Sequence, residues 1–273
     1  RKYIKNCLGD RSKRTVFSNN SALTWAMLDD LGNRYRTARD IPLTLCGQGM
    51  MIRRSLVQKI GGWPYRTLTE DYELRLDGLL KGFRSMYWPY AVLYTEEALS
   101  HRDNYKRRLR WLTGYAQCDE KYKKQIKAQA KARGKMNRGE FECLYGVYPL
   151  AFFAAASIFT IVAGCALAGI YAVDDKPALM MKSILFLIVT PFAVMYVLLF
   201  IYSLLAMTAS REAFTILSFW EKLGTLLFAP LYILEYIPIY INGLWNIRKK
   251  SKLEWGESKR ERYTNIADDP PEA

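Results

Sequence analysis

Two acidic side chains, Glu70 and Asp71, follow Thr69 where the sequence predicts the start of a helix over residues 70–80. Acids at a helix N-terminus often do no more than cap the helix and complement its dipole. The functional interpretation is a general base at the rim of a cleft, which must reach a substrate hydroxyl within hydrogen-bond distance. On these residues alone, both interpretations stay open.

A cluster of arginines follows, in a long basic helix predicted over residues 104–132. Arg107, Arg108 and Arg110 stand beside Trp111 in this helix. Arginines at this spacing can hold a diphosphate through bidentate hydrogen bonds, and an indole offers a flat platform for a sugar ring. The alternative is a solvated helix face beside a membrane, with the tryptophan as an interfacial anchor.

A third group of residues, Trp255 to Arg260, lies just beyond the last apolar segment of the chain. A basic tail next to a membrane would have a similar composition, so this group alone does not identify a site.

These groups must be positioned by helices and strands, and the sequence pattern of residues 1–143 predicts an α/β class. A helix is expected from Val16 to Leu31, and short strands over 41–46, 84–88 and 91–95. The first strand runs into Cys46-Gly47-Gln48-Gly49, and glycines at a strand end let the backbone approach another group closely.

The charge is unevenly distributed along the chain. The 273 residues carry a net charge of +14, yet only four of the forty Lys and Arg lie between Leu144 and Ile247, with five acids. A basic part joined to a near-neutral apolar part is typical of a cytoplasmic domain on a membrane anchor, and it argues against a nucleic-acid partner. The five cysteines are scattered and there is one histidine, so no metal site is predicted in this chain.

Three apolar segments divide the rest of the chain. Residues 144–173 and 183–210 carry no charge and are long enough to span a bilayer. The third segment, residues 223–247, contains Glu235 and two prolines. It is either a third span or an interfacial or re-entrant helix, and the basic residues on both flanks favour the second. The predicted division is a soluble part over 1–143, a membrane region over 144–247 and a basic cytoplasmic tail over 248–273.

Taken in order, these motifs resemble the processive family 2 glycosyltransferases, which include cellulose, chitin, hyaluronan and poly-N-acetylglucosamine synthases. The order is Leu45-Cys46-Gly47, Gly61-Gly62-Trp63, Thr69-Glu70-Asp71, the arginine–tryptophan cluster and then the membrane helices. The resemblance covers roughly residues 40 to 262. It implies the carboxyl-terminal half of a GT-A-type α/β domain, followed by transmembrane helices.

Residue by residue, the resemblance implies that Asp71 is the catalytic base with Glu70 beside it. Trp255, Ser258 and Arg260 look like part of a gating loop that folds over the donor. The family's glutamine before the Arg-Trp pair is Arg107 here, which is a departure from the motif. The implied substrate-binding residues are Thr69, Cys46, Gly47, Gln48, Arg107, Arg108, Arg110, Trp111, Trp255, Ser258 and Arg260.

The implied reaction is the inverting transfer of a hexose or N-acetylhexosamine from a UDP-sugar to a glycan acceptor in polysaccharide synthesis. The divalent cation of the family, Mg²⁺ or Mn²⁺, should be held by carboxylates upstream of Arg1, so we expect this chain alone to be inactive. The expected location is a multi-pass cell membrane protein with a cytoplasmic catalytic part. There are two rival interpretations. One is a transporter subunit, but apolar segments whose only internal charge is Glu235 would form a poor conduction path. The other is a non-catalytic basic membrane scaffold.

Overall fold

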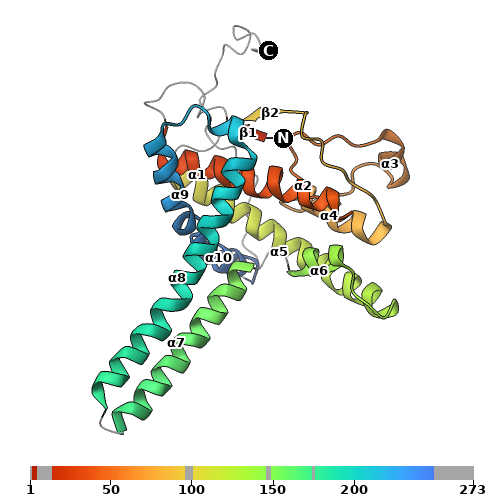
Figure 1. Ribbon diagram of the computed structural model, residues 1–273. Helices are drawn as coiled ribbons and strands as arrows, with labels where there is room; N and C mark the ends of the chain where they lie inside the picture. The colour runs from red at the N-terminus through yellow and green to blue at the C-terminus, as the bar shows by residue number, and fades with distance from the viewer. Residues whose placement is uncertain (1, 5–13, 96–100, 146–148, 174–175, 249–273) are drawn as a thin grey trace.

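The computed structural model describes residues 2–4, 14–95, 101–145, 149–173 and 176–248, and Figure 1 shows the path of the chain through them. In chain order the elements are β1 (Lys2–Ile4), α1 (Val16–Trp25), the π-helix η3 (Ala26–Leu31), α2 (Gly32–Ala38), α3 (Arg54–Lys59), α4 (Glu70–Lys81), β2 (Leu93–Thr95), α5 (His101–Ala132), α6 (Arg138–Tyr145), α7 (Pro149–Val173), α8 (Pro177–Ala209), the 3₁₀-helix η4 (Arg211–Phe214), α9 (Phe219–Leu234) and α10 (Tyr236–Arg248).

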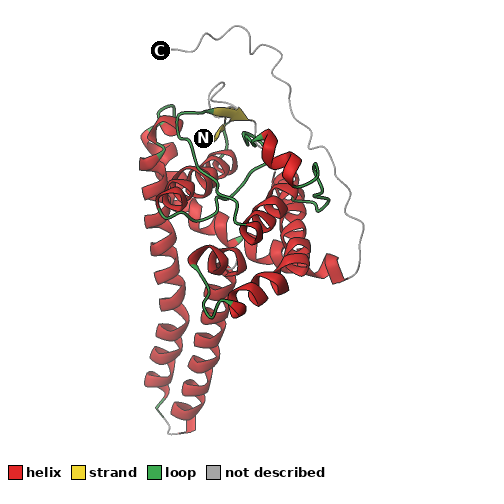
Figure 2. Cartoon of the chain, turned by 90° about the vertical axis from the view of Figure 1, so that its right-hand side faces the viewer, coloured by secondary structure: helices red, strands yellow, loops and turns green. Residues whose placement is uncertain are grey.

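The predicted α/β class, with a GT-A-type domain, is wrong for these residues, which are mostly helical (Figure 2). Their only strands, β1 and β2, have three residues each and pair in parallel. The segment expected to be a strand at 41–46 has no regular structure, because side chains satisfy its backbone. The amide of Asn33 both donates to the carbonyl of Thr44 (3.0 Å) and accepts from its N–H (2.9 Å). Backbone groups satisfied in this way need no neighbouring strand.

The helix predicted to start at Glu70 is confirmed as α4. It ends at Lys81, and the next residue, Gly82, has a φ of 70°, the left-handed conformation that glycine adopts without strain. Thr69 stands at the N-cap position, but its side chain makes no capping hydrogen bond. Acids in the first turn complement the helix dipole instead.

Two cores hold the body of the molecule together. One core joins α1 and η3 to the last turns of α8 and to α9, around Leu23, Ala206, Phe214 and Ala229. The other joins α4, α5 and α6 around Leu76, Cys118, Ile126 and Leu144. α5 therefore runs through the middle of the body, and one of its faces packs against α4 while another packs against α10.

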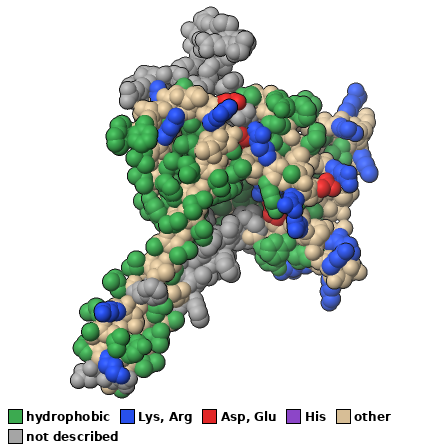
Figure 3. Space-filling view, in the orientation of Figure 1, with side chains coloured by type: hydrophobic (Ala, Val, Ile, Leu, Met, Phe, Trp, Pro, Cys, Tyr) green, Lys and Arg blue, Asp and Glu red, His purple; other side chains and the backbone are tan. Residues whose placement is uncertain are grey.

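Helices α7 and α8 form a long hairpin that projects from the body, and hydrophobic side chains cover much of its surface (Figure 3). The two helices approach closely at Gly164, where an added Cβ would lie 3.0 Å from the Cβ of Leu187. Within the described residues, two helical stretches are long and apolar enough to cross a membrane, Pro177–Ala209 and Phe219–Trp245. The chain therefore carries apolar helices consistent with membrane association.

Candidate active site

The N-terminus of α4 holds the carboxylate of Asp71 in a fixed position. The backbone N–H of Gly47 donates to Oδ2 of Asp71 (2.8 Å), and the N–H of Tyr72 donates to Oδ1 (2.7 Å). These two bonds fix the orientation of the carboxylate and leave each oxygen with a further lone pair. An acceptor hydroxyl could donate to either oxygen.

Burial raises the pKa of Asp71, and the charge of Glu70 raises it further. The backbone hydrogen bonds from Tyr72 and Gly47 oppose this shift because they stabilise the ionised form. A carboxylate whose pKa lies above its ordinary value is a stronger proton acceptor, provided that it stays ionised at the working pH.

Helix α5 lies against this N-terminus and carries Arg110 to it. The guanidinium of Arg110 donates to the carbonyl of Leu68 (2.7 Å), and Gln117 accepts from the N–H of the same residue (3.1 Å). Burial lowers the pKa of Arg110, whereas the negative charges of Glu70 and Asp71 oppose that shift. The arginine is therefore close enough to both carboxylates to feel their charges.

The close approach of α5 depends on Gly114. A Cβ at this position would lie 2.6 Å from Oγ1 of Thr69 and 2.9 Å from its backbone nitrogen. The side chain of Thr69 is buried here, with its hydroxyl 3.7 Å from the sulfur of Cys118. Thr69 thus packs α4 against α5 and does not face solvent.

Cys46, Gly47 and Gln48 form the loop that passes over the carboxylates. An added Cβ at Gly47 would lie 3.5 Å from Oε1 of Glu70 and 3.8 Å from Oδ2 of Asp71. Gln48 is exposed and accepts a hydrogen bond from the hydroxyl of Thr95 (3.2 Å). Cys46 is half-buried beside Tyr115. The structure therefore brings this loop together with Glu70, Asp71 and Arg110.

Glu73 supports the site and was not singled out in the sequence. Its carboxylate is fully buried and accepts from the N–H groups of Arg66 and Thr67 (3.0 Å each), from Lys121 and from Tyr122 (3.2 Å). Burial alone would raise the pKa of Glu73, but these hydrogen bonds lower it overall. It ties the loop before α4 to both α4 and α5. The only feature of the sequence that could have indicated this role is the position of Glu73, about one helical turn after Glu70.

Trp111 lies next to a second tryptophan that the sequence also did not single out. The rings of Trp25, on α1, and Trp111 meet edge to face with centroids 5.6 Å apart. The guanidinium of Arg107 lies over the Trp111 ring at 5.1 Å. An aromatic pair of this kind offers apolar ring faces to a sugar. Nothing in the spacing of Trp25 and Trp111 along the chain could have predicted that they meet.

Arg108 lies on a different face of α5 from Arg110. It is buried between the rings of Tyr232 and Tyr236, at 4.0 and 4.1 Å, and donates to Glu235 (3.2 Å). Glu235 also contacts His101. Arg108 therefore joins α5 to the junction of α9 and α10, and the structure does not bring it to the carboxylates of α4.

Three of the predicted site residues, Trp255, Ser258 and Arg260, lie outside the described residues. Among the described residues, no three His, Cys, Asp or Glu side chains come together in a way that could hold a metal ion. Glu70 and Asp71 supply only two carboxylates, with Arg110 beside them. The positive charge of Arg110, which interacts with both carboxylates, disfavours a cation at this pair.

Comparison with known proteins identifies the group to which the chain is related. A 71-residue stretch is 32% identical to the probable glycosyltransferase YdaM of Bacillus subtilis (strain 168), a match that covers 26% of this chain and 17% of that protein. No solved structure matches the chain. The family model described as "glycosyl transferase family group 2" matches residues 2–233, which is most of the chain. The protein therefore belongs to glycosyl transferase family group 2.

Proposed function

We propose that this chain supplies the acceptor side and the catalytic base of an inverting sugar transfer at the cytoplasmic face of a membrane. The observation that supports it most is the arrangement of Asp71, which is oriented by two backbone N–H groups, raised in pKa by burial, and accompanied by Arg110. The proposed donor is a UDP-hexose or UDP-N-acetylhexosamine, and the proposed acceptor is a growing glycan.

In the proposed step, a carboxylate oxygen of Asp71 takes the proton of an acceptor hydroxyl. The hydroxyl oxygen then attacks the anomeric carbon, the bond from that carbon to the UDP oxygen breaks, and the leaving diphosphate carries away the bonding electron pair. Attack opposite to the leaving group inverts the anomeric configuration. The base has to be within hydrogen-bond reach of the hydroxyl, and the free lone pairs of Asp71 allow that.

Arg110 is proposed to stabilise the charge that gathers on the departing diphosphate. Partial burial lowers the local dielectric, so a fixed positive group there contributes more than it would in water. The edge-to-face pair of Trp25 and Trp111 is proposed to bind the acceptor glycan through its apolar ring faces. The divalent cation expected from the family resemblance stays a prediction.

The decisive variant is Asp71→Asn, tested by transfer of radiolabelled sugar from UDP-sugar to glycan in membranes that contain the full protein. Loss of a general base reduces the rate by about 10² to 10⁴. The matched control is Glu120→Gln, which makes the same change from carboxylate to amide at an exposed position of α5. Near-normal transfer by Asp71→Asn, with normal amounts of folded protein, would refute Asp71 as the base.

A further inference from the structure

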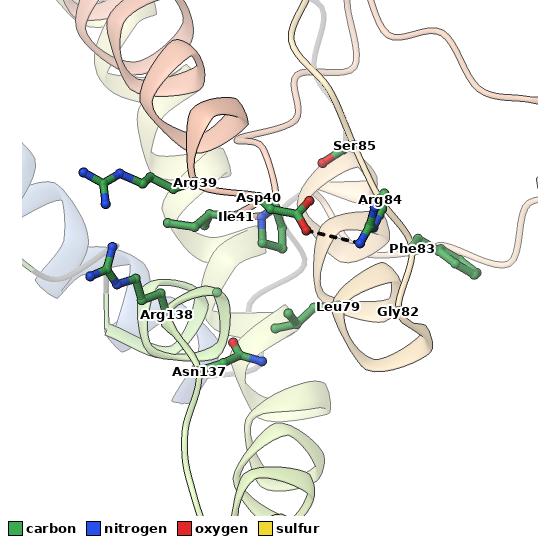
Figure 4. A pocket seen from close by; sticks show the side chains of 12 residues that line it. Arg39, Asp40, Ile41, Leu79, Gly82, Phe83, Arg84, Ser85, Asn137 and Arg138 are labelled. Atoms are coloured by element: carbon green, nitrogen blue, oxygen red, sulfur yellow. Dashed lines mark ion pairs between the residues drawn. The ribbon is translucent and has the colours of Figure 1, made fainter.

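A surface cleft of about 420 Å³ lies between the ends of α2 and α4 and the start of α6 (Figure 4). Its lining includes Pro42 and Leu79, and its arginines come from three segments: Arg39 follows α2, Arg84 follows α4, and Arg138 begins α6. The start of α6 packs tightly here, because an added Cβ at Gly139 would lie 2.9 Å from Pro42. The cleft is a separate site, since it lies at the opposite end of α4 from Asp71.

The cleft has an excess of positive charge. Arg84 faces Asp40 at 3.5 Å, and Figure 4 shows Arg39 and Arg138 on the other side of the cleft. The nearest acids of α6 already have partners: Glu140 contacts Arg133, and Glu142 accepts from both Arg36 (2.5 Å) and Arg75 (3.0 Å). In the described part of the chain, neither Arg39 nor Arg138 is in an ion pair. The guanidinium groups of Arg39 and Arg138 thus line the cleft without a carboxylate in an ion pair with either, which favours an anionic ligand such as a phosphate.

The outer face of α6 is apolar and aromatic beyond Arg138. Positions 138, 141 and 145 fall on one side of a helix, and the side chains of Phe141 and Tyr145 are 60% and 40% exposed. The opposite side of the helix is buried, at Glu140, Cys143 and Leu144. An exposed pair of rings next to basic side chains is typical of the interface between a bilayer and water. Pro149 begins the apolar helix α7 only a few residues after Tyr145.

We propose that this cleft binds the phosphate headgroup of an anionic phospholipid in the leaflet that α7 enters. Arg39 and Arg138 contact the phosphate, and Phe141 and Tyr145 lie at the level of the glycerol and upper acyl chain. The exposed lysines of the α5–α6 turn region, Lys127, Lys131 and Lys135, add to the attraction of the same membrane surface. A free phosphate in solution would explain the arginines but would leave the exposed rings without a partner.

The experiment compares lipid binding by the full chain and by the double variant R39A/R138A, using native mass spectrometry of protein in detergent titrated with phosphatidylglycerol or phosphatidylcholine. The double variant R53A/R54A is the matched control, because it removes two exposed arginines around the start of α3 that do not line the cleft. Inorganic phosphate is added in a parallel arm. All three proteins are first compared by their thermal unfolding midpoints.

The parent chain and R53A/R54A should retain phosphatidylglycerol in preference to phosphatidylcholine. R39A/R138A should lose about thirtyfold in affinity for phosphatidylglycerol, because each basic side chain at a membrane surface contributes about fivefold and the two factors multiply. Equal losses in both double variants would overturn the proposal, since binding would then depend on net charge alone. Full displacement of the lipid by millimolar phosphate would also overturn it, in favour of a free-phosphate site. If R39A/R138A fails to fold, R39Q/R138Q provides the same test with longer side chains.

Discussion

At the scale of single residues, the pH dependence of sugar transfer tests whether Asp71 is the base, because the charge of Glu70 next to it shifts its pKa. The base must be ionised, so activity should fall as the pH drops through the pKa of Asp71, at a higher pH than for an ordinary aspartate. Glu70 contributes to that elevation. Glu70→Gln should therefore move the acidic limb of the kcat/KM profile to lower pH, whatever it does to the maximum rate.

The comparison for this measurement is Glu120→Gln, which should leave the acidic limb where the parent chain has it. An unmoved limb in Glu70→Gln would mean that the group titrating in the profile is not next to Glu70, and hence is not Asp71.

The motifs identified from the sequence assigned Asp71, Gly47 and Arg110 to one site. These residues lie far apart along the chain, and they are close together in the structure. It was less informative for residues whose role depends on three-dimensional neighbours. Arg108 stands two positions before Arg110 in the same cluster, yet the turn of the helix points it to the other side, toward Glu235. Trp25 and Glu73 belong to no recognised motif, and only the packing of α1, α4 and α5 shows what they contact.

At the scale of elements, helices were predicted more accurately than strands. A helix satisfies its own backbone, so its local pattern is enough, as α4 and α5 illustrate. A strand depends on a neighbour that the local pattern does not reveal. The segment at 41–46 has an apolar, strand-like composition, but the amide of Asn33 and the hydroxyl of Ser85 take up its backbone groups. This is why the strand predicted at 41–46 is absent, whereas the one predicted at 91–95 is present as β2, where β1 supplies a neighbour.

Gly114 provides a test of how closely α5 must approach α4. Gly114→Ala would place its Cβ 2.6 Å from Oγ1 of Thr69 and 2.9 Å from its backbone nitrogen, so the helices must move apart. Such overpacking costs about 1–3 kcal/mol. It should lower the thermal unfolding midpoint of the purified protein in detergent and also reduce sugar transfer, because Arg110 would be displaced from Leu68 and the carboxylates.

The matched substitution is Gly224→Ala in α9, where an added Cβ has no neighbour within 4 Å. There the change should be neutral or stabilising by up to about 1 kcal/mol, since alanine has the higher helix propensity. Equal destabilisation by both substitutions would show that the effect of Gly114→Ala does not come from its contact with Thr69.

At the scale of the whole molecule, α8 belongs to two environments. Its last turns are buried against α1 and η3, where the hydroxyl of Ser210 donates to Asp30 (2.5 Å). The earlier part, from Pro177 to about residue 198, carries exposed apolar side chains such as Leu185 and Val189. This part is about 33 Å long, which is close to the roughly 30 Å of a bilayer core. The described part of α8 is therefore long and apolar enough to cross a bilayer, and α7 packs alongside it.

Helices α9 and α10 are apolar enough to span a membrane, but their packing favours another position. The helix breaks at Glu235, which contacts Arg108 and His101 of α5. Beyond the break, Asn242 donates to the hydroxyl of Tyr105 (2.9 Å), and Gly243 lies against the backbone of α5. α5 is strongly basic, and charged side chains are costly in hydrocarbon. A helix that packs along α5 is thus held at the body, consistent with an interfacial position.

This arrangement predicts the location of Ser258, which follows α10 outside the described residues. If α7 and α8 cross the membrane and α9 and α10 do not, Ser258 lies on the same side as α5. A cysteine at Ser258 should then resist a membrane-impermeant thiol reagent in intact cells and react after permeabilisation. Lys176→Cys, at the far end of the hairpin, should be labelled in intact cells, and the unsubstituted chain gives the background from the native cysteines. Labelling at 258 in intact cells would place α9 and α10 across the bilayer and would separate Trp255 and Arg260 from Asp71.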